Sequence, residues 1–424
     1  MSIFEKIKEK RELKKAKGPE EVNVSSKHLV LRIILFLVFL GVGITGIVVG
    51  CTYNSTHLEP GWHPVSCTEG ENNSEDLTLM CYFSDGKREN ASQMKTVTNY
   101  YTKLCNNAYK IFNEYKIFEE TNGVAYINAH PNEDIKVEEA LYNAFKKAND
   151  NNVKQIFYCP IMDNYHNLFK AESDAEAIIY DPYYDLNARS MISEIIAYLN
   201  NEDVKITLKE NNTVRLEVSE EYLNYSKTNN INKYVSFSYF YNSVIVDYIF
   251  EHLSSSGVPN FKIYSYDGCY RSHFTDSSLT DSYLYYAYTN EHIIPAGKVK
   301  LVGSNSLVEL KIFPVSQKED YYVYIDKQFV HHFLDDDGYY KSCVNGFALY
   351  NNESVPTYDL LLKGSKVFTA DSLNVDVLRT LGNFIYNDGT VIKYSDDKLE
   401  ITDLFDKDGM TFTKELIWWI LRNI

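Results

Sequence analysis

The sequence predicts an α+β fold, a bilobed domain of mixed sheet and helices that is preceded by one transmembrane helix. Three observations indicate it. Helical and strand patterns alternate along the chain without an internal repeat, a long apolar run lies near the N-terminus, and the composition is that of a folded protein. Of the 424 residues, 45% are hydrophobic and 24% are charged, and 36 Tyr with 22 Phe supply bulk for a large core. Wholesale disorder is therefore excluded.

The apolar run spans residues 29–50 and is interrupted only by Arg32. At about 1.5 Å per residue, a helix of this length crosses a bilayer core of about 30 Å. Residues 1–50 have a net charge of +4, which leaves −20 for the rest of the chain. Because most of the basic residues precede the run, we expect residues 1–28 in the cytoplasm and the large part outside a bacterial cell membrane. The acidity of residues 51–424 argues against a nucleic-acid partner, since like charges repel.

The end of the apolar run leaves two kinds of anchor open. Val48-Val49-Gly50-Cys51 resembles a bacterial lipobox, which predicts lipidation of Cys51 after the preceding segment is cleaved. The 28 residues before the run are long for a cleaved signal and favour an uncleaved signal anchor. Both kinds tether the large domain at the outer face of the membrane.

The six other cysteines also have two possible states. An even number in an oxidising compartment permits disulfides, with fifteen connectivities. Free cysteines, in contrast, pack as small hydrophobic residues. The chain has no Cys-x-x-Cys pair, which argues against a zinc site. These cysteines are Cys67, Cys81, Cys105, Cys159, Cys269 and Cys343.

Changes in composition divide the part of the chain after the anchor. Residues 51–75 are polar and show no hydrophobic period, so we predict a linker. Residues 76–410 are predicted to form one large domain. The tail, residues 411–424, contains Trp418 and Trp419 on an amphipathic segment, which predicts either contact with the membrane surface or docking on the domain.

Hydrophobic spacing predicts the elements of the large domain in order. Apolar residues at i, i+3, i+4 and i+7 predict a helix over 136–149, ended by an Asn-rich run. Alternation over 203–218, broken at Asn211-Asn212, predicts a hairpin. Aromatic and β-branched runs predict further strands, and one-sided apolar patterns predict further helices. These are a strand over 234–241, a helix over 243–253, a strand over 261–266 that ends at Asp267-Gly268, and a helix over 370–384.

Six segments of this domain resemble, in order, the FAD:protein FMN transferases, known as the ApbE family. The first two are an aromatic-rich stretch with an Ile127-Asn128 pair (111–148) and FYCPIMDNYHNLF (157–169). SFSYFYNSVIVD (236–247) stands where the family's most recognisable motif lies, and Tyr266-Asp267-Gly268-Cys269 where its Gly-Gly turn lies. His331-His332-Phe333-Leu334-Asp335 is similar to its His-His-Ile-Ile-Asp, and Thr369-Ala370-Asp371-Ser372-Leu373 to its Ala-Asp-Ala-Leu.

The resemblance implies a domain that binds FAD with Mg²⁺ and moves the FMN half onto a Thr or Ser hydroxyl of a client protein. This chemistry needs a metal that neutralises the pyrophosphate and a base that takes the hydroxyl proton. By the same resemblance, Asn128 and Gly268 are candidates for cofactor binding and Asp371 for metal binding. The catalytic candidates are His331, His332 and Asp335.

The chain departs from the family in the segment from Ser236 to Val244. The family pattern is Asp, aliphatic, Gly, Gly or Ala, aliphatic, Ala, Lys, Gly, Tyr, and here it is Ser-Phe-Ser-Tyr-Phe-Tyr-Asn-Ser-Val. The carboxylate and the Lys are therefore replaced by Ser236 and Asn242. Glycine lets backbone approach a pyrophosphate and lysine supplies a point charge, whereas Tyr239 fills the space of a phosphate. Val375 stands where the family has a hydroxyl ligand to the metal, and it has no oxygen to give.

Each candidate residue also has a structural interpretation. Asp371 suits the first turn of a helix, where the macrodipole favours an acid. Of two adjacent histidines in a strand, one points into the core and the other outward. The run Asp335-Asp336-Asp337-Gly338 is either a loose Ca²⁺ site or a solvated turn. Asp247, which matches a family Asp, is interpreted as structural.

Three functions follow as hypotheses. The first is a membrane-tethered pseudoenzyme that keeps the fold and a groove for flavin or for a client protein. The second is an active flavin transferase, or an FAD pyrophosphatase, with rearranged ligands. The third is an unrelated surface adhesion or scaffold domain. The replaced residues between Ser236 and Ser243 favour the first.

Overall fold

The computed structural model describes most of the chain, which forms two compact units. The described residues are 28–56, 58–68, 70, 72, 74–84, 88–289, 292–313, 321–351, 355–387, 391–394 and 401–403. The first unit is Met1–Leu58 with Lys87–Ala91, and the second is Glu59–Gly86 with Ser92–Ile424. The predicted cytoplasmic segment, except His28, and the predicted tail over 411–424 lie outside the described residues.

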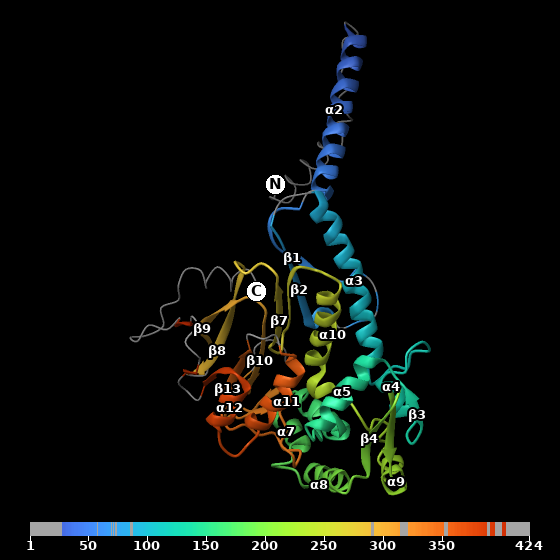
Figure 1. The fold of residues 1–424 in the computed structure, drawn as a ribbon, viewed down its shortest axis with the longest axis vertical. Coiled ribbons are helices and arrows are strands. Elements are labelled where there is room, and N and C mark those ends of the chain that lie inside the picture. Colours follow the sequence, from blue (N-terminus) through green and yellow to red (C-terminus); the bar gives the residue numbers. More distant parts are fainter. Residues whose placement is uncertain are drawn as a thin grey trace, which may run out of the picture. The chain divides into compact units, whose positions relative to one another are not determined.

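The first unit contains a long helix, α2 (Leu29–Thr56), which covers the apolar run (Figure 1). Its described side chains are mostly apolar and exposed, among them Val30, Phe39 and Ile47. Among the residues that the structure describes, no helix is both long enough and apolar enough to cross a bilayer. The side chain of Cys51 lies outside the described set.

An eight-stranded sheet organises the second unit, and all its strand pairs are antiparallel among the residues described. Together with the helices below, it confirms the predicted α+β class. In spatial order from one edge, the strands are β1 (Gly61–Val65), β2 (Leu77–Phe83), β6 (Asn260–Ser265), β7 (Cys269–Phe274), β10 (Asn305–Lys311), β13 (Gly346–Asn351), β14 (Asn383–Asn387) and β15 (Val391–Tyr394).

Three smaller antiparallel sheets complete the described strands. The first contains β3 (Asp134–Lys136), β5 (Thr213–Val218) and β4 (Val204–Lys209). The second contains β16 (Ile401–Asp403), β9 (His292–Val302) and β8 (Thr280–Thr289). The third pairs β11 (Tyr321–Val323) with β12 (Phe329–His331).

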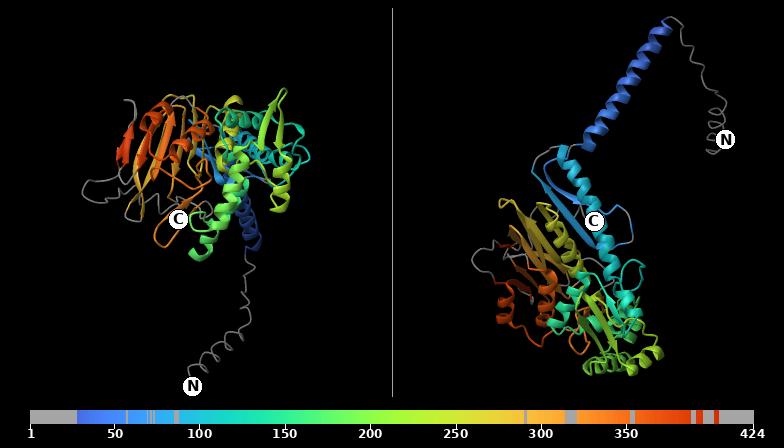
Figure 2. Two further views of the ribbon diagram at one scale, coloured as in Figure 1. Left: turned by 90° about the horizontal axis from the view of Figure 1, so that it is seen from below. Right: turned by 45° about the vertical axis from the view of Figure 1, so that its right-hand side comes forward.

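Helices α10 (Tyr241–Ser255) and α11 (Thr357–Phe368) pack against β7 and its neighbours in the large sheet (Figure 1 and Figure 2). Helix α10 buries Val246, Ile249 and Leu253 at helical spacing. The α-helices of this unit are α3 (Arg88–Phe112) from Ser92 onward, α4 (Val124–Ala129), α5 (Glu139–Asp150), α6 (Cys159–Phe169), α7 (Asp174–Ala177), α8 (Leu186–Asn200), α9 (Glu220–Thr228), α10, α11 and α12 (Val375–Leu381). Short 3₁₀ helices are η1 (Ser74–Asp76), η2 (Gln155–Phe157), η3 (Ile178–Tyr180) and η4 (Ser238–Phe240).

Several predicted elements are confirmed. The helix predicted over 136–149 is α5, and its apolar face is buried. The predicted hairpin is the β4–β5 pair, and Asn211 and Asn212 turn the chain with φ of +59° and +55°. Asparagine tolerates this left-handed region better than most residues, which suits the three-residue turn, 210–212, between the two strands. The strand predicted over 261–266 is β6.

The strand predicted over 234–241 is wrong. Ser238–Phe240 form η4, which leads directly into α10. The preceding backbone is held by single contacts in place of a strand partner, for example Ser236 N, which donates to Ile156 O at 2.7 Å. The rings of Phe237 and Tyr239 are buried in the packed interior, so a run of aromatic residues produced the pattern of a strand without one.

The helix predicted over 370–384 is correct only in its middle. Helix α12 begins after Asn374, whose Oδ1 accepts from Val377 N at 3.1 Å. It ends at Leu381, and the next residue, Gly382, has φ of +130°, where a Cβ would lie 2.9 Å from Tyr350 O. The chain then enters β14, so the apolar pattern beyond residue 382 belongs to a strand.

The segment predicted as a linker, 51–75, contains the edge strand β1. Contacts of Trp62 hold this polar segment against the neighbouring part of the sheet. Its ring lies 5.4 Å from that of Tyr82 and 5.5 Å from that of Phe274, and the Lys262 ammonium lies 4.9 Å from its centroid.

Candidate functional site

A cavity of about 220 Å³ lies at the N-terminal end of α10. It brings together residues from five of the six segments that carry the resemblance. These are Phe112 to Tyr115, Met162 and His166, then Ser238, Tyr239, Tyr241 and Asn242, then Tyr266 and Asp267, and finally His332. Asp76 of η1 completes the lining. Segments that are far apart in the sequence therefore meet at one cavity. No short-range sequence pattern predicted that they would meet.

Tyr239 occupies the centre of the altered motif. Its side chain is 5% exposed, and its ring lies edge-on to Phe240 at 4.5 Å. It also packs edge-on against His332 and Phe333, at 6.1 Å from each ring. Burial raises the pKa of Tyr239 well above its ordinary value, so the hydroxyl stays protonated. The expectation that this ring fills space at the motif agrees with its packing.

Two polar groups of α10 that line the cavity have no hydrogen-bond partner among the described residues. They are Tyr241 Oη and Asn242 Oδ1, and both atoms are buried. Asn242 stands at the position of the family's Lys, and its side chain is 6% exposed. Because a buried acceptor without a donor costs about 1–3 kcal/mol, these atoms favour a bound molecule that can hydrogen-bond to them.

Acidic side chains dominate the charge of the cavity. Asp76, Glu114 and Asp267 line it, and none of the described lining residues is Lys or Arg. Glu114 pairs with Lys233 at 3.2 Å, outside the lining, and Lys233 also contacts Asp163 at 2.8 Å. Burial raises the pKa of Glu114, although Lys233 opposes the shift. An anionic ligand would therefore meet negative charge here.

Glu114 and Lys233 were not found from the sequence. They lie 119 residues apart in the chain, and neither belongs to a motif. The Lys233 ammonium also lies 4.4 Å from the ring centroid of Tyr115, a lining residue. This pair holds the loop after α3 against the segment before η4.

Asn128, a predicted cofactor ligand, is turned toward the protein backbone. Its Oδ1 accepts from Tyr234 N at 2.9 Å and Val235 N at 3.0 Å, and its Nδ2 donates to Val235 O at 2.9 Å. The side chain is buried and does not line the cavity. It therefore positions the segment that leads into the altered motif, and its part in cofactor binding stays a prediction.

Gly268, the other predicted cofactor ligand, forms the turn that presents Tyr266 and Asp267 to the cavity. Its φ is +102°, and a Cβ there would lie 2.8 Å from Glu309 Cβ. Only glycine adopts this conformation so close to another chain segment without strain. The backbone of this turn is fixed by Glu309 N, which donates to Gly268 O at 3.0 Å.

The two predicted catalytic histidines point in different directions, as expected. His331 is buried, and its Nδ1 accepts from Phe333 N at 3.3 Å. Burial, with a smaller effect of His332, lowers the pKa of His331 to about 3, so the ring is neutral at physiological pH. His332 is half-buried and lines the cavity.

Asp335, the third catalytic candidate, caps a turn. Its Oδ1 accepts from Asp337 N and Tyr339 N, both at 3.0 Å. Burial raises the pKa of Asp335. Tyr158 Oη donates to the Asp336 carbonyl at 3.0 Å, which fixes the same turn from outside. Asp335 does not line the cavity, and these bonds favour the structural interpretation.

Asp371, the predicted metal ligand, lies at the surface. Its side chain is 94% exposed and pairs with Lys341, and this hydrogen bond lowers the pKa of Asp371. Within the described residues, no group of three or more His, Cys, Asp or Glu side chains is arranged to hold a metal ion. Val375, at the position of the family's hydroxyl ligand, begins α12. Metal binding by Asp371 stays a prediction.

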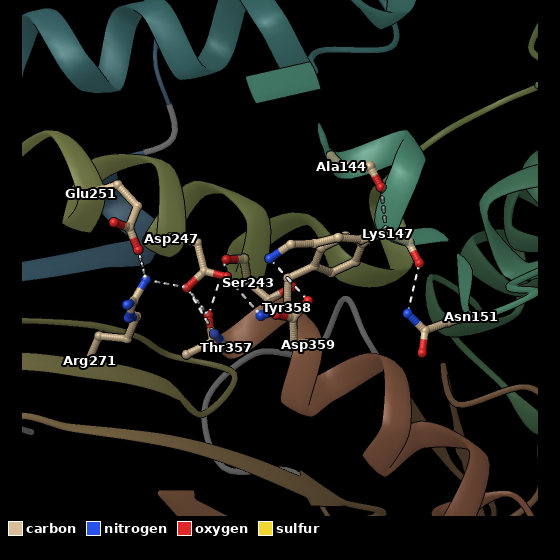
Figure 3. Close-up of polar contacts among 10 residues, drawn as sticks. All are labelled: Ala144, Lys147, Asn151, Ser243, Asp247, Glu251, Arg271, Thr357, Tyr358 and Asp359. Carbon is tan, nitrogen blue, oxygen red and sulfur yellow. Dashed lines mark hydrogen bonds and ion pairs between the residues drawn. The ribbon is translucent and has the colours of Figure 1, made fainter. Parts of the chain in front are cut away.

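Asp247, two turns along α10, has a different environment (Figure 3). Its carboxylate accepts from Thr357 N at 2.8 Å, Thr357 Oγ1 at 3.0 Å and Tyr358 N at 2.9 Å. Arg271 Nη1 donates to the same carboxylate at 3.0 Å. The bonds to the first residues of α11 cap that helix, as an acid at a helix N-terminus does. The predicted structural role of Asp247 agrees with this geometry.

A second cavity, of about 740 Å³, borders this network between α5, α10 and the start of α11. Charged surface residues such as Glu139, Lys146 and Asp150 make up much of its lining. Lys147, also in the lining, pairs with Asp359 at 3.0 Å (Figure 3). None of the residues predicted for catalysis, cofactor or metal binding lines this cavity, so the smaller cavity is the candidate site.

Comparison with known proteins identifies the fold. No protein-family model matches the chain, and no curated protein sequence matches it. Among solved structures, it is similar to the flavin transferase ApbE from Vibrio cholerae, with 12% identity, a TM-score of 0.51, and coverage of 81% of this chain and 97% of that one. It is also similar to the ApbE protein from Thermotoga maritima, with 14% identity, a TM-score of 0.52, and coverage of 78% and 96%. The chain therefore has the fold of the family that its segments resemble.

Proposed function

We propose that this chain is a membrane-tethered protein that uses the flavin-transferase fold to bind a ligand and does not transfer flavin. The observation that carries the proposal is the buried ring of Tyr239, which leaves a cavity of about 220 Å³ at the altered motif. Sites for drug-sized ligands measure about 300–1,000 Å³. A dinucleotide as large as FAD is therefore too large for this cavity.

The charges around the cavity do not fit FAD with Mg²⁺ either. A pyrophosphate is anionic, whereas the charged lining residues other than histidine are the acids Asp76, Glu114 and Asp267 among the residues described. The one predicted metal ligand, Asp371, is not part of the lining. The position of the family's Lys holds Asn242, which supplies no positive charge.

The same cavity favours a small ligand that is uncharged or cationic. The unpaired atoms of α10 in the lining, Tyr241 Oη and Asn242 Oδ1, would accept or exchange hydrogen bonds with hydroxyl or ammonium groups. The acids of the lining would stabilise a positive charge.

The membrane tether is a part of the proposal. It is supported by the apolar run over 29–50, by the basic residues before it, and by the exposed apolar side chains of α2. The large domain would lie outside a bacterial cell. Deletion of residues 1–50 is expected to move the protein from the membrane fraction to the soluble fraction after alkaline extraction. Mass spectrometry of the mature N-terminus distinguishes a lipidated Cys51 from an uncleaved anchor.

The activity test uses the full chain in detergent with FAD, Mg²⁺ and a client peptide that bears an acceptor Thr. We expect no flavin fluorescence on the peptide and no FAD binding at millimolar concentration, while the Vibrio cholerae enzyme run in parallel labels it. Flavin transfer at a comparable rate would establish the active-transferase hypothesis instead.

A restoring variant sharpens this test. Tyr239→Gly with Asn242→Lys returns two residues of the family motif, and we expect it to bind FAD more tightly than the wild type does. Asn201→Lys adds the same charge at an exposed position outside the cavity lining and serves as the control. If the restoring variant gains nothing, the altered motif is not the reason for inactivity.

A melting-temperature series tests the ligand class. Choline and ribitol serve as a small cation and a small polyol, and FMN serves as an anion. We expect the melting temperature to rise with choline or ribitol and not with FMN, and Glu114→Gln to weaken the effect of choline. If neither choline nor ribitol raises the melting temperature, the proposal that the cavity binds a small uncharged or cationic ligand is wrong.

A further inference from the structure

Two cysteines of the described chain are in contact, although they are far apart in the sequence. Cys67 follows the edge strand β1, and Cys105 lies in helix α3. Their side chains hydrogen-bond to each other. Cys67 is half-buried and Cys105 is buried.

The backbone around this contact is held in register by further polar contacts. Thr68 N donates to Thr102 Oγ1 at 3.2 Å, and Asn72 Nδ2 donates to Asn106 Oδ1 at 2.8 Å. Both bonds join the segment after β1 to successive turns of α3, on either side of Cys105. The two thiols therefore meet because two segments lie side by side over several residues.

We propose that Cys67 and Cys105 form an intramolecular disulfide that fastens the segment after β1 to helix α3. Thiols that already touch need only a small movement to reach bonding distance. The reaction is an exchange with a small disulfide such as oxidised glutathione. One sulfur–sulfur bond forms in the protein, that of glutathione breaks, and the two thiol protons end on two reduced glutathione molecules.

Cys67 is the group that starts this exchange. The hydrogen bond from Cys105, against the effect of burial, lowers the pKa of Cys67 to about 7. A large fraction of Cys67 is therefore thiolate at neutral pH, and it attacks the disulfide of glutathione. Cys105 then displaces the glutathione from Cys67 and closes the protein disulfide.

The other described cysteines lack these properties. Cys81, Cys159 and Cys269 are buried, and burial raises the pKa of each thiol. Cys343 Sγ donates to Val367 O at 3.2 Å. Of the fifteen connectivities that six cysteines allow, the structure therefore favours those that contain the Cys67–Cys105 bond.

Peptide mapping of the full chain in detergent tests the proposal. The reduced protein is equilibrated with oxidised glutathione, alkylated, and cut after glutamate and after aromatic residues without reductant. Cleavage after Trp62, Glu69, Tyr101 and Tyr109 places the two cysteines in separate peptides that contain no other cysteine. We expect the fragments 63–69 and 102–109 to be linked, with a mass 2 Da below their sum, and to separate on reduction.

Two variants provide the controls. Cys67→Ser, a change at a half-buried position, is expected to abolish the linked peptide and the rise in melting temperature on oxidation, about 5 °C for a bond of this kind. Cys343→Ser is expected to retain both. A folded wild-type protein that yields no 67–105 peptide, or that links Cys67 to another cysteine, would overturn the proposal.

Discussion

The two parts of helix α10 have opposite hydrogen-bonding environments. At its N-terminal end, Tyr241 Oη and Asn242 Oδ1 are buried without a partner among the described residues, beside a small acidic cavity. Two turns later, the Asp247 carboxylate receives four hydrogen bonds from Arg271, Thr357 and Tyr358. The same helix thus has one satisfied polar centre and one unsatisfied centre.

This difference distinguishes a residue that stabilises the fold, Asp247, from residues that line the cavity, Tyr241 and Asn242. The bonds of Asp247 join α10, β7 and α11, and they stabilise the packing of both helices on the sheet. The residues at the N-terminal end are free to differ from the family, because their polar atoms take little part in the packing. The packing that keeps the fold therefore does not depend on which polar residues stand at the motif.

The largest test of the comparison is Asp247→Asn. The amide loses the charge opposite Arg271, which is buried, and half of the acceptor capacity for α11. We expect the free energy of unfolding to fall by about 3–5 kcal/mol in urea denaturation. Glu251→Gln, which changes the 60%-exposed second partner of Arg271, should cost at most about 1 kcal/mol. Equal losses would show that Asp247 has no special role.

The pH dependence of stability tests the neutral state of His331 near the cavity. Its pKa is lowered to about 3 in the folded chain, from an ordinary value of 6.5, so the unfolded chain binds the proton first as the pH falls. Stability from this group is complete above pH 6.5 and is lost toward pH 3, by about 1.4 kcal/mol per pH unit.

The measurement compares wild type with His331→Asn in urea at pH 7.5, 6 and 5, so that the other titrating groups cancel. We expect wild type to lose about 2 kcal/mol more than the variant between pH 7.5 and pH 5. Identical pH profiles would contradict a neutral, buried His331.

Gly268→Ala tests whether the turn beside the cavity depends on glycine. The left-handed φ of +102° and the approach of Glu309 Cβ both oppose a side chain, and we expect a loss of about 2–3 kcal/mol in the same assay. Gly303→Ala is the matched control, because Gly303 has φ of +76° but open space around its Cβ. It should lose only about 1 kcal/mol. A similar loss in both variants would leave no role for Glu309.

The smallest expected effect belongs to Asn242→Leu. Because Asn242 Oδ1 has no partner among the described residues, the apolar side chain should leave stability unchanged or raise it by up to about 1 kcal/mol. Asn128→Leu, which removes three hydrogen bonds to buried backbone, should lower stability by about 3 kcal/mol. If Asn242→Leu destabilised the protein as much as Asn128→Leu does, the N-terminal end of α10 would not be an unsatisfied polar centre.

The sequence predicted those features of the fold that depend on local spacing. Helix α5 and the β4–β5 hairpin follow from the positions of apolar residues and from an Asn-Asn turn. The segment over 234–241 was misassigned because burial of aromatic rings in the interior is decided by distant residues, such as Ile156 and Asn128. Short-range patterns contain no information about such partners.

The candidate site, like the fold, could be predicted only in part from the sequence. The segments around Tyr239 and His332 could be found by their resemblance to the family, and they meet at one cavity. The unpaired state of Asn242 and the pairing of Glu114 with Lys233 could not be found, because both depend on which side chains approach in three dimensions.

Strand β1 also affects how copies of this protein meet. It lies at one edge of the large sheet, where an exposed strand invites pairing with another molecule. β1 has only five residues, and Pro64 within it has no N–H to donate. This border therefore resists the growth of a continuous intermolecular sheet, which protects crowded copies from aggregation.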